Sequence, residues 1–148
     1  MRPEANIPRM EGFGFVRAQP VEFRDLDGLG HVNNAVYGSY LESAKVDYFR
    51  EVVGVTALED LGIVADLKVT FRSPAFLGET LAVGTRIGHI GTKSLQFEFE
   101  FRGPDGRLVA EASSVHVAFD YERRETTAVP NEWRRRIEAH EARTLARA

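Results

Sequence analysis

Hydrophobic and polar residues alternate along four stretches of the chain, at 63–71, 79–87, 95–102 and 108–119. A period of two is typical of strands that bury one face and leave the other in water, as in an antiparallel sheet. The third stretch shows it most regularly, with apolar side chains at Leu95, Phe97, Phe99 and Phe101. The Gly-Pro-Asp-Gly sequence at 103–106 then predicts a hairpin turn into the last stretch.

The alternation of the last stretch changes phase part-way. Its apolar side chains stand first at even and then at odd positions, in the order Leu108, Ala110, Ala112, Val115, Val117 and Phe119. One extra residue in a strand produces such a change of face. We therefore expect a β-bulge near Ser113 and Ser114.

The N-terminal part of the chain predicts an arm followed by one more strand. Residues 1–12 are mostly polar, and we expect a flexible arm there. We expect residues 13–148 to form a single domain, because a chain of 148 residues is short for two. Four odd positions from Phe13 to Phe23 are apolar, which predicts a strand. Pro20 has no N–H for a ladder, so this strand should lie at a sheet edge or be broken there.

Two segments show the three- and four-residue spacing of helices. The first runs from about Ala35 to Val53 and ends at Gly54, a residue suited to the left-handed conformation that closes helices. Its apolar stripe consists of Tyr37, Tyr40, Leu41, Ala44, Tyr48, Val52 and Val53, and its polar side of Glu42, Lys45, Asp47, Arg50 and Glu51. The second, from Asn131 to about Arg147, has a thin stripe of Trp133 and Ile137 and predicts a surface helix.

These elements predict an α+β architecture. Only the first helix is amphipathic enough to cover the buried face of the sheet. Five strands are wider than one helix, so the sheet should curl around it. We expect a five-stranded antiparallel sheet wrapped around one long central helix, plus a C-terminal helix.

Composition and charge exclude several classes of function. The chain has no cysteine, which removes disulfides, thiolate nucleophiles and zinc-thiolate sites. A net charge of −3 argues against a nucleic-acid partner, which normally requires a basic surface. The sequence has no apolar run long enough to cross a bilayer, so we expect no membrane partner and a cytoplasmic location.

The connection between the first strand and the first helix contains several side chains that can take part in catalysis. It reads Asp27-Gly28-Leu29-Gly30-His31-Val32-Asn33-Asn34, with Asn33 or Asn34 as a natural N-cap. A carboxylate and an imidazole thereby come next to a helix N-terminus, which supplies unsatisfied N–H groups and a partial positive charge. An aspartate in a glycine-containing turn also often closes the turn through local hydrogen bonds, and that role is open to Asp27 as well.

This segment resembles the hotdog-fold acyl-CoA thioesterases, in particular the branch of 4-hydroxybenzoyl-CoA thioesterase. The resemblance runs from about Phe15 to Trp133 and implies the hotdog fold. Its landmarks are Asp25-x-Asp27, Gly30-His31-Val32-Asn33-Asn34, Tyr37, Pro74 with Gly78-Glu79, and Asp120. The segment from Asp25 to Asn34 is the most specific of them.

The resemblance implies roles for three residues of this loop. The family's catalytic carboxylate corresponds to Asp27, and the backbone N–H that polarises the thioester carbonyl corresponds to that of Asn34. Plant acyl-carrier-protein thioesterases have an Asp-x-Asn-x-His arrangement here, whereas this chain keeps Asp27 and His31 but has Leu29 between them. Another bacterial branch has a histidine at the position of Asn34. His31 can therefore contact the loop backbone, orient Asp27 or touch the substrate.

The resemblance also implies where the substrate binds. Lys93 matches a position at which the family places a basic residue for the nucleotide of CoA. The further candidates for substrate binding are Asn33, Tyr37, Arg72, Arg123 and Arg124. We expect no cofactor, since CoA is part of the substrate. We also expect no metal, because Asp25, Asp27 and His31 lack a fourth ligand and an H-x-x-x-H spacing.

The expected function is hydrolysis of an acyl-CoA or aroyl-CoA to the free acid and CoA, with Asp27 as nucleophile or as general base. Hydrolysis of an acyl-carrier-protein thioester and a non-catalytic acyl-binding module remain alternatives. A hydratase would need an Asp and His pair at another spacing. One helix wrapped by one sheet leaves sheet edges open, so we expect a homodimer or homotetramer.

Overall fold

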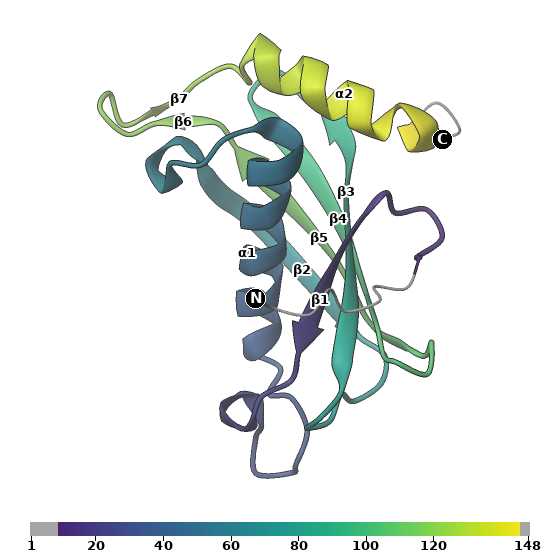
Figure 1. Ribbon diagram of the computed structural model, residues 1–148. Coiled ribbons are helices and arrows are strands. Elements are labelled where there is room, and N and C mark those ends of the chain that lie inside the picture. The colour runs from purple at the N-terminus through teal and green to yellow at the C-terminus, as the bar shows by residue number, and fades with distance from the viewer. Residues whose placement is uncertain (1–8, 146–148) are drawn as a thin grey trace.

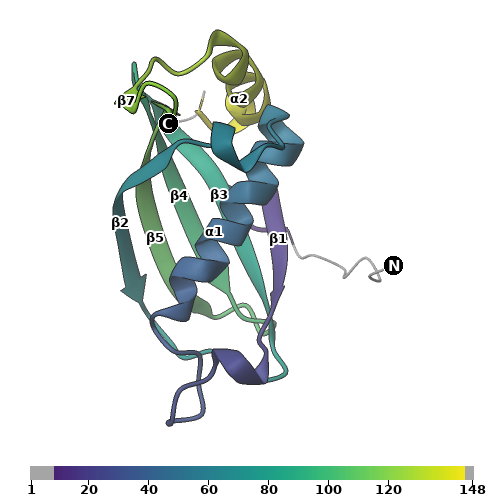
Figure 2. The ribbon, with the colours of Figure 1, turned by 90° about the vertical axis from the view of Figure 1, so that its left-hand side faces the viewer.

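The computed structural model describes residues 9–145, and its five-stranded antiparallel sheet bends around one long helix, α1 (Val36–Tyr48). The strand order is β1-β3-β4-β5-β2. The strands are β1 (Phe15–Pro20), β2 (Ile63–Phe71), β3 (Thr80–Ile90), β4 (Ser94–Arg102) and β5 (Leu108–Val117). Figures 1 and 2 show α1 lying across the concave face of the sheet, with β1 and β2 at its two edges. The predicted architecture is confirmed.

The core lies between α1 and the sheet. All four apolar side chains predicted to face inward from β4 are buried, as are Tyr37, Tyr40, Leu41, Ala44 and Tyr48 of α1. Aromatic rings join the two layers, with centroids of Tyr48 and Phe97 5.6 Å apart and those of Tyr37 and Phe101 5.4 Å apart. Edge-to-face pairs of this kind stabilise a core beyond the area that they bury. The helix is therefore fixed on the sheet along its whole length.

The bounds of the first predicted helix are confirmed to within one residue, and the structure adds a detail at each end. After Tyr48 the chain continues as a π-helical turn, η2 (Phe49–Val53), and it stops at Gly54, whose φ of 83° is the predicted left-handed conformation. At the other end, the side chain of Asn33 accepts a hydrogen bond from the N–H of Ala35 at 3.0 Å. Asn33, and not Asn34, thus supplies the side-chain acceptor for the start of the helix.

Lys45 is an exception to the predicted polar side of α1. The sequence places it with Glu42 and Asp47, yet the residue is only 3% exposed. The error arises because Lys45 is four residues after Leu41, and a helix brings such positions onto one face. Its long aliphatic stem can follow the core while the ammonium meets a carboxylate.

The predicted bulge near Ser113 and Ser114 is wrong. Residues of β4 and β5 pair without interruption from Ser94 with Val117 to Phe101 with Ala110. Ser114 and His116 continue the buried face instead of Val115 and Val117, and polar residue types on that face disguised the alternation. An irregularity does occur in β2, between Val64 and Asp66.

The first strand is shorter than predicted. β1 ends at Pro20 and lies at an edge of the sheet, as the proline requires, but Phe23 begins the short 3-10 helix η1 (Phe23–Asp25) and is 80% exposed. The Asp25 carboxylate accepts a hydrogen bond from the N–H of Glu22 at 2.9 Å. This contact closes a turn that takes the chain away from the sheet directly after Pro20.

The other edge strand, β2, has the predicted bounds but leaves much of its apolar surface exposed. Ile63, Val64, Leu67 and Phe71 are 37–46% exposed. An apolar edge strand with free N–H and C=O groups is a surface that proteins normally cover. The single chain therefore ends in an uncovered edge on this side.

The C-terminal helix α2 (Asn131–Leu145) covers the end of the sheet near the C-terminal end of α1 (Figure 1). Trp133 and Ile137 are buried as predicted, and Glu141 extends the buried stripe by accepting a hydrogen bond from the Tyr48 hydroxyl at 2.8 Å. Before α2, the short strands β6 (Phe119–Asp120) and β7 (Glu125–Thr126) form a hairpin. None of the described helices is long and apolar enough to span a membrane.

The predicted flexible arm, residues 1–12, lies mostly outside the described residues, which begin at position 9. Within the described part, Met10 is 9% exposed and forms an isolated bridge with Phe13. The flexibility of the arm stays a prediction.

Candidate active site

The loop that carries Asp27 is closed on itself and fastened to the neighbouring connection between β2 and β3. Leu26 pairs with Val32, and the N–H of Asp27 donates to the carbonyl of His31 at 2.9 Å. The N–H of Val32 then donates to the carbonyl of Ala75 at 2.9 Å. Gly30 sits at φ 84°, a conformation that residues with a side chain rarely adopt. The loop is thereby a rigid support for the Asp27 side chain.

The two carboxylate oxygens of Asp27 have different partners. Oδ1 accepts a hydrogen bond from the N–H of Leu29 at 2.8 Å, which is the turn-closing role expected of an aspartate here. Oδ2 lies 3.3 Å from Nδ1 of His31. The Asp27 and His31 side chains are 27% and 32% exposed, so the pair is accessible from solvent. One oxygen holds the loop while the other is paired with an imidazole at the surface.

Asn34 lies between this pair and the first turn of α1. The backbone N–H groups on either side of it are already hydrogen-bonded. That of Asn33 donates to the carbonyl of Asp25, and that of Ala35 donates to the Asn33 side chain. Among the hydrogen bonds of residues 9–145, none has the N–H of Asn34 as donor, and Asn34 is exposed. An uncommitted N–H at a helix N-terminus, reinforced by the helix dipole, is suited to an oxygen that gains negative charge.

Asp25 fastens the loop to the helix. Its carboxylate accepts hydrogen bonds from the Tyr40 hydroxyl at 2.6 Å and from the N–H of Glu22. Burial, together with this carboxylate, raises the pKa of Tyr40 well above its usual range, so the hydroxyl remains a donor. Asp25 is therefore a structural acid that sets the position of Asp27.

Arg107 is a bracing residue that the sequence did not reveal. Its guanidinium contacts both carboxylate oxygens of Glu79, at 2.5 and 2.8 Å, and the carbonyl of Pro74 at 2.8 Å. Hydrogen bonds from Arg107 hold the pKa of Glu79 below its ordinary value. The contacts tie the β4–β5 hairpin to the segment that holds Val32, and the Gly78-Glu79 landmark is the only trace of them in the sequence.

The other predicted site residues fall into two groups. Asn33, Tyr37 and Arg72 lie at the Asp27 end of the sheet, where Tyr37 is buried and Arg72 contacts Glu111 at 3.1 Å. Lys93 precedes β4 at the opposite end, and its Nζ donates to Thr126 at 3.3 Å. Arg123 and Arg124 lie there too, in the β6–β7 hairpin. Within a single chain, these three cations therefore lie at the end of the sheet opposite Asp27.

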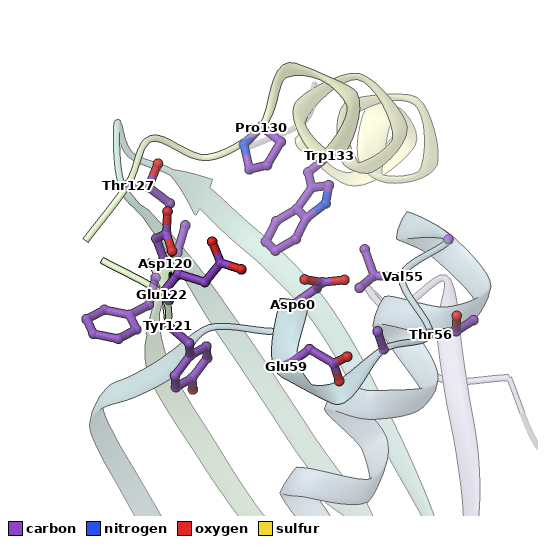
Figure 3. Close-up of a pocket in the computed structure, with 14 residues that line it drawn as sticks. Val55, Thr56, Glu59, Asp60, Asp120, Tyr121, Glu122, Thr127, Pro130 and Trp133 are labelled. Atoms are coloured by element: carbon purple, nitrogen blue, oxygen red, sulfur yellow. Dashed lines mark hydrogen bonds between the residues drawn. The ribbon is translucent and has the colours of Figure 1, made fainter. Parts of the chain in front are cut away.

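A cavity of about 720 Å³ also lies at the end opposite Asp27 (Figure 3). It opens between the segment after α1, the β6–β7 hairpin and the start of α2. Trp133 and Tyr121 line it together with four carboxylates, from Glu59, Asp60, Asp120 and Glu122. The Asp27 loop does not contribute to it. This cavity and the Asp27 loop therefore occupy different ends of one chain.

Comparison with known proteins identifies the family. The family model of the thioesterase-like superfamily matches residues 21–137, which include the Asp27 loop, all of α1 and four of the five sheet strands. The chain belongs to this superfamily. It is a hotdog-fold thioester hydrolase, as the resemblance of its sequence implied.

Individual thioesterases are similar to this chain over most of its length. The long-chain acyl-CoA thioesterase FadM of Escherichia coli (strain K12) is 28% identical over 117 residues, 76% of this chain and 89% of FadM. The acyl-acyl carrier protein thioesterase ATL3 of Arabidopsis thaliana is 28% identical over 129 residues, 80% of this chain and 67% of ATL3. A thioesterase from Thermus thermophilus, solved with coenzyme A and Zn, is 36% identical with a TM-score of 0.82, covering 90% of this chain and 98% of that one.

Proposed function

We propose that this thioesterase hydrolyses an acyl-CoA or aroyl-CoA to the free acid and CoA at the Asp27 loop. One observation carries the proposal: a solvent-accessible carboxylate, paired with His31, lies in the loop that leads to an uncommitted N–H at the start of α1. The similarity to FadM and to a thioesterase that binds coenzyme A supports CoA as the carrier of the acyl group.

In the proposed mechanism, Asn34 activates the thioester carbonyl and Asp27 acts as nucleophile or general base. The Asn34 N–H and the helix dipole polarise the thioester carbonyl, and one such donor is worth about 2.7–4 kcal/mol in a transition state. Asp27 then either attacks the carbonyl carbon, giving a mixed anhydride that water cleaves, or removes a proton from the attacking water. In both routes the C–S bond breaks and CoA leaves as the thiol. The contact with Nδ1 of His31 orients the Asp27 carboxylate.

We propose that two copies pair through β2. Pairing of identical edge strands about a two-fold axis is antiparallel, so the Ile63 end of one strand meets the Phe71 end of the other. This brings the partner's end that carries Lys93, Arg123 and Arg124 toward the Asp27 loop. The separation of the two groups within one chain is then what a site between subunits requires, and the cations can meet the phosphates of CoA. Such dimers can associate further into tetramers.

The remaining expectations belong to the same proposal. CoA enters as part of the substrate, and we propose no resident metal or organic cofactor. Within residues 9–145 no group of three or more His, Asp or Glu side chains is placed to hold a metal ion. A cytoplasmic location and the absence of a nucleic-acid partner stay predictions from the sequence.

The test is a panel of acyl groups presented both on CoA and on acyl carrier protein. We expect hydrolysis of the CoA thioesters with the higher kcat/KM. ATL3 makes the carrier-protein thioester the second candidate, and a higher kcat/KM for that series would replace our proposal with it. Binding without turnover of either series would identify a non-catalytic acyl-binding module instead.

A further inference from the structure

A second cavity, of about 330 Å³, lies beside α1 under the start of β2. Its walls are mainly apolar and include Phe49, Leu58, Leu61, Ile63 and Val64. Three polar residues complete the lining: Glu42, Lys45 and His116. Neither the Asp27 loop nor the larger acidic cavity shares a residue with it. An apolar pocket with a few convergent polar groups is the usual form of a small-molecule site.

Lys45 is the unusual member of this lining. Its side chain is 4% exposed, although lysine is almost never buried in proteins unless it is paired. Nζ lies 3.0 Å from the carboxylate of Glu42, which is itself 59% exposed, and 6.0 Å from the centre of the Phe97 ring. An ammonium has three N–H donors, and Glu42 accounts for one of them among the described contacts. Lys45 can therefore donate to a further group in the cavity.

His116 adds an acceptor to the same lining. Its Nε2 donates to the carbonyl of Leu61, which leaves Nδ1 as an acceptor, and Nδ1 has no hydrogen-bond partner within the described residues. Burial lowers the pKa of His116 to about 4, so the ring is neutral near pH 7. The residue is 4% exposed and packs against the Phe49 and Phe97 rings. The polar lining thus combines a donor with an acceptor.

We infer that this cavity binds the distal end of the acyl group and that Lys45 recognises a hydroxyl there. The inference rests on the proposed function. A hydroxyl can accept from Lys45 and donate to His116, whereas a carboxylate cannot donate. Glu42 already balances the charge of Lys45, so an anionic end would be left without compensation. Lys45 lies about 16 Å along α1 from Asn34, so the polar group must be at the far end of the acyl chain.

The test compares each acyl-CoA with its ω-hydroxy and ω-carboxy derivatives at chain lengths of eight, ten, twelve and fourteen carbons. At one of these lengths we expect kcat/KM for the ω-hydroxyacyl-CoA to exceed that of its parent by about tenfold, the scale of a hydrogen bond to a charged group. Lys45→Met should remove this preference, so that the ω-hydroxyacyl-CoA and its parent have equal kcat/KM in the variant. Arg50→Met, which removes an exposed cation from the turn η2 directly after α1, should leave the preference unchanged.

A second variant keeps the test independent of any effect of Lys45→Met on folding. Glu42→Gln changes an exposed side chain and leaves the charge of Lys45 unbalanced, so the preference should move toward the ω-carboxyacyl-CoA. A wild-type enzyme that shows no ω-hydroxy preference at any length would overturn the inference, as would a preference that survives Lys45→Met. A wild-type preference for the ω-carboxy derivative would overturn the assignment of a hydroxyl.

Failure of the proposed function can be told apart from failure of this inference. If no acyl-CoA is hydrolysed at all, the cavity is tested by calorimetry with free 12-hydroxydodecanoic acid and dodecanoic acid. Tighter binding of the hydroxy acid that is lost in Lys45→Met would support the cavity assignment alone. Equal binding of the two acids would refute it.

Discussion

His116 should make the protein sensitive to acid in a range where most carboxylates are still ionised. Burial lowers its pKa from 6.5 to about 4, with Lys45 adding to the effect, while the hydrogen bond to Leu61 and the charge of Glu42 oppose it. Between these two pH values the unfolded chain binds one more proton at this position than the folded chain. Stability therefore falls as the pH is lowered from 6.5 to 4, by about 3 kcal/mol from this residue.

Urea unfolding across this range, in wild type and His116→Gln, measures the contribution. The variant loses packing and should be less stable at pH 7, but its deficit should shrink by about 3 kcal/mol on going to pH 4. His89→Gln, at an exposed position of β3, is the matched control and should run parallel to wild type. If the curve of His116→Gln also runs parallel to wild type, the histidine is not held neutral by burial.

Three further predictions concern the fold and the assembly. Tyr48→Phe removes the hydroxyl that donates to buried Glu141 and should lower the free energy of unfolding by about 2 kcal/mol; an unchanged urea midpoint would contradict this. Gly62→Ala places a Cβ 2.3 Å from the Val117 carbonyl at φ 84° and should cost more than Gly78→Ala, which has open space at φ 87° and serves as control. Leu67→Lys on the exposed edge of β2 should shift the protein from dimer to monomer in sedimentation velocity, and an unaltered dimer would move the interface elsewhere.

The sequence predicted the fold wherever the residue types followed the period of their element. β4 is the clearest case, because every apolar position is buried and every polar one lies on the other face. The end of β5 was misjudged since the buried face carries Ser114 and His116. Lys45 was misjudged for the same reason: a residue type that is normally exposed occupies a core position. Two of these three polar residues, Lys45 and His116, line the small cavity.

The candidate site was predictable where its residues are adjacent in the chain. The spacing of Asp27, His31 and Asn34 within one strand-to-helix connection is enough to bring them together. The brace formed by Arg107 and Glu79 joins residues 28 positions apart, and no local pattern indicates such a contact. The distance between Lys93 and Asp27 depends on the sheet topology, and their meeting depends on a second copy of the chain.

The central claim, that Asp27 carries the chemistry, is tested most directly by the turnover of Asp27→Asn. The amide retains an oxygen that can accept from the N–H of Leu29, so the loop and the thermal stability should be preserved. It can neither attack a thioester nor accept a proton from water, and general-base assistance alone is worth about 10²–10⁴-fold. We predict that kcat for acyl-CoA falls by at least about a hundredfold with an unchanged melting temperature. Wild-type turnover in this variant, or loss of the fold, would show that Asp27 only closes the turn.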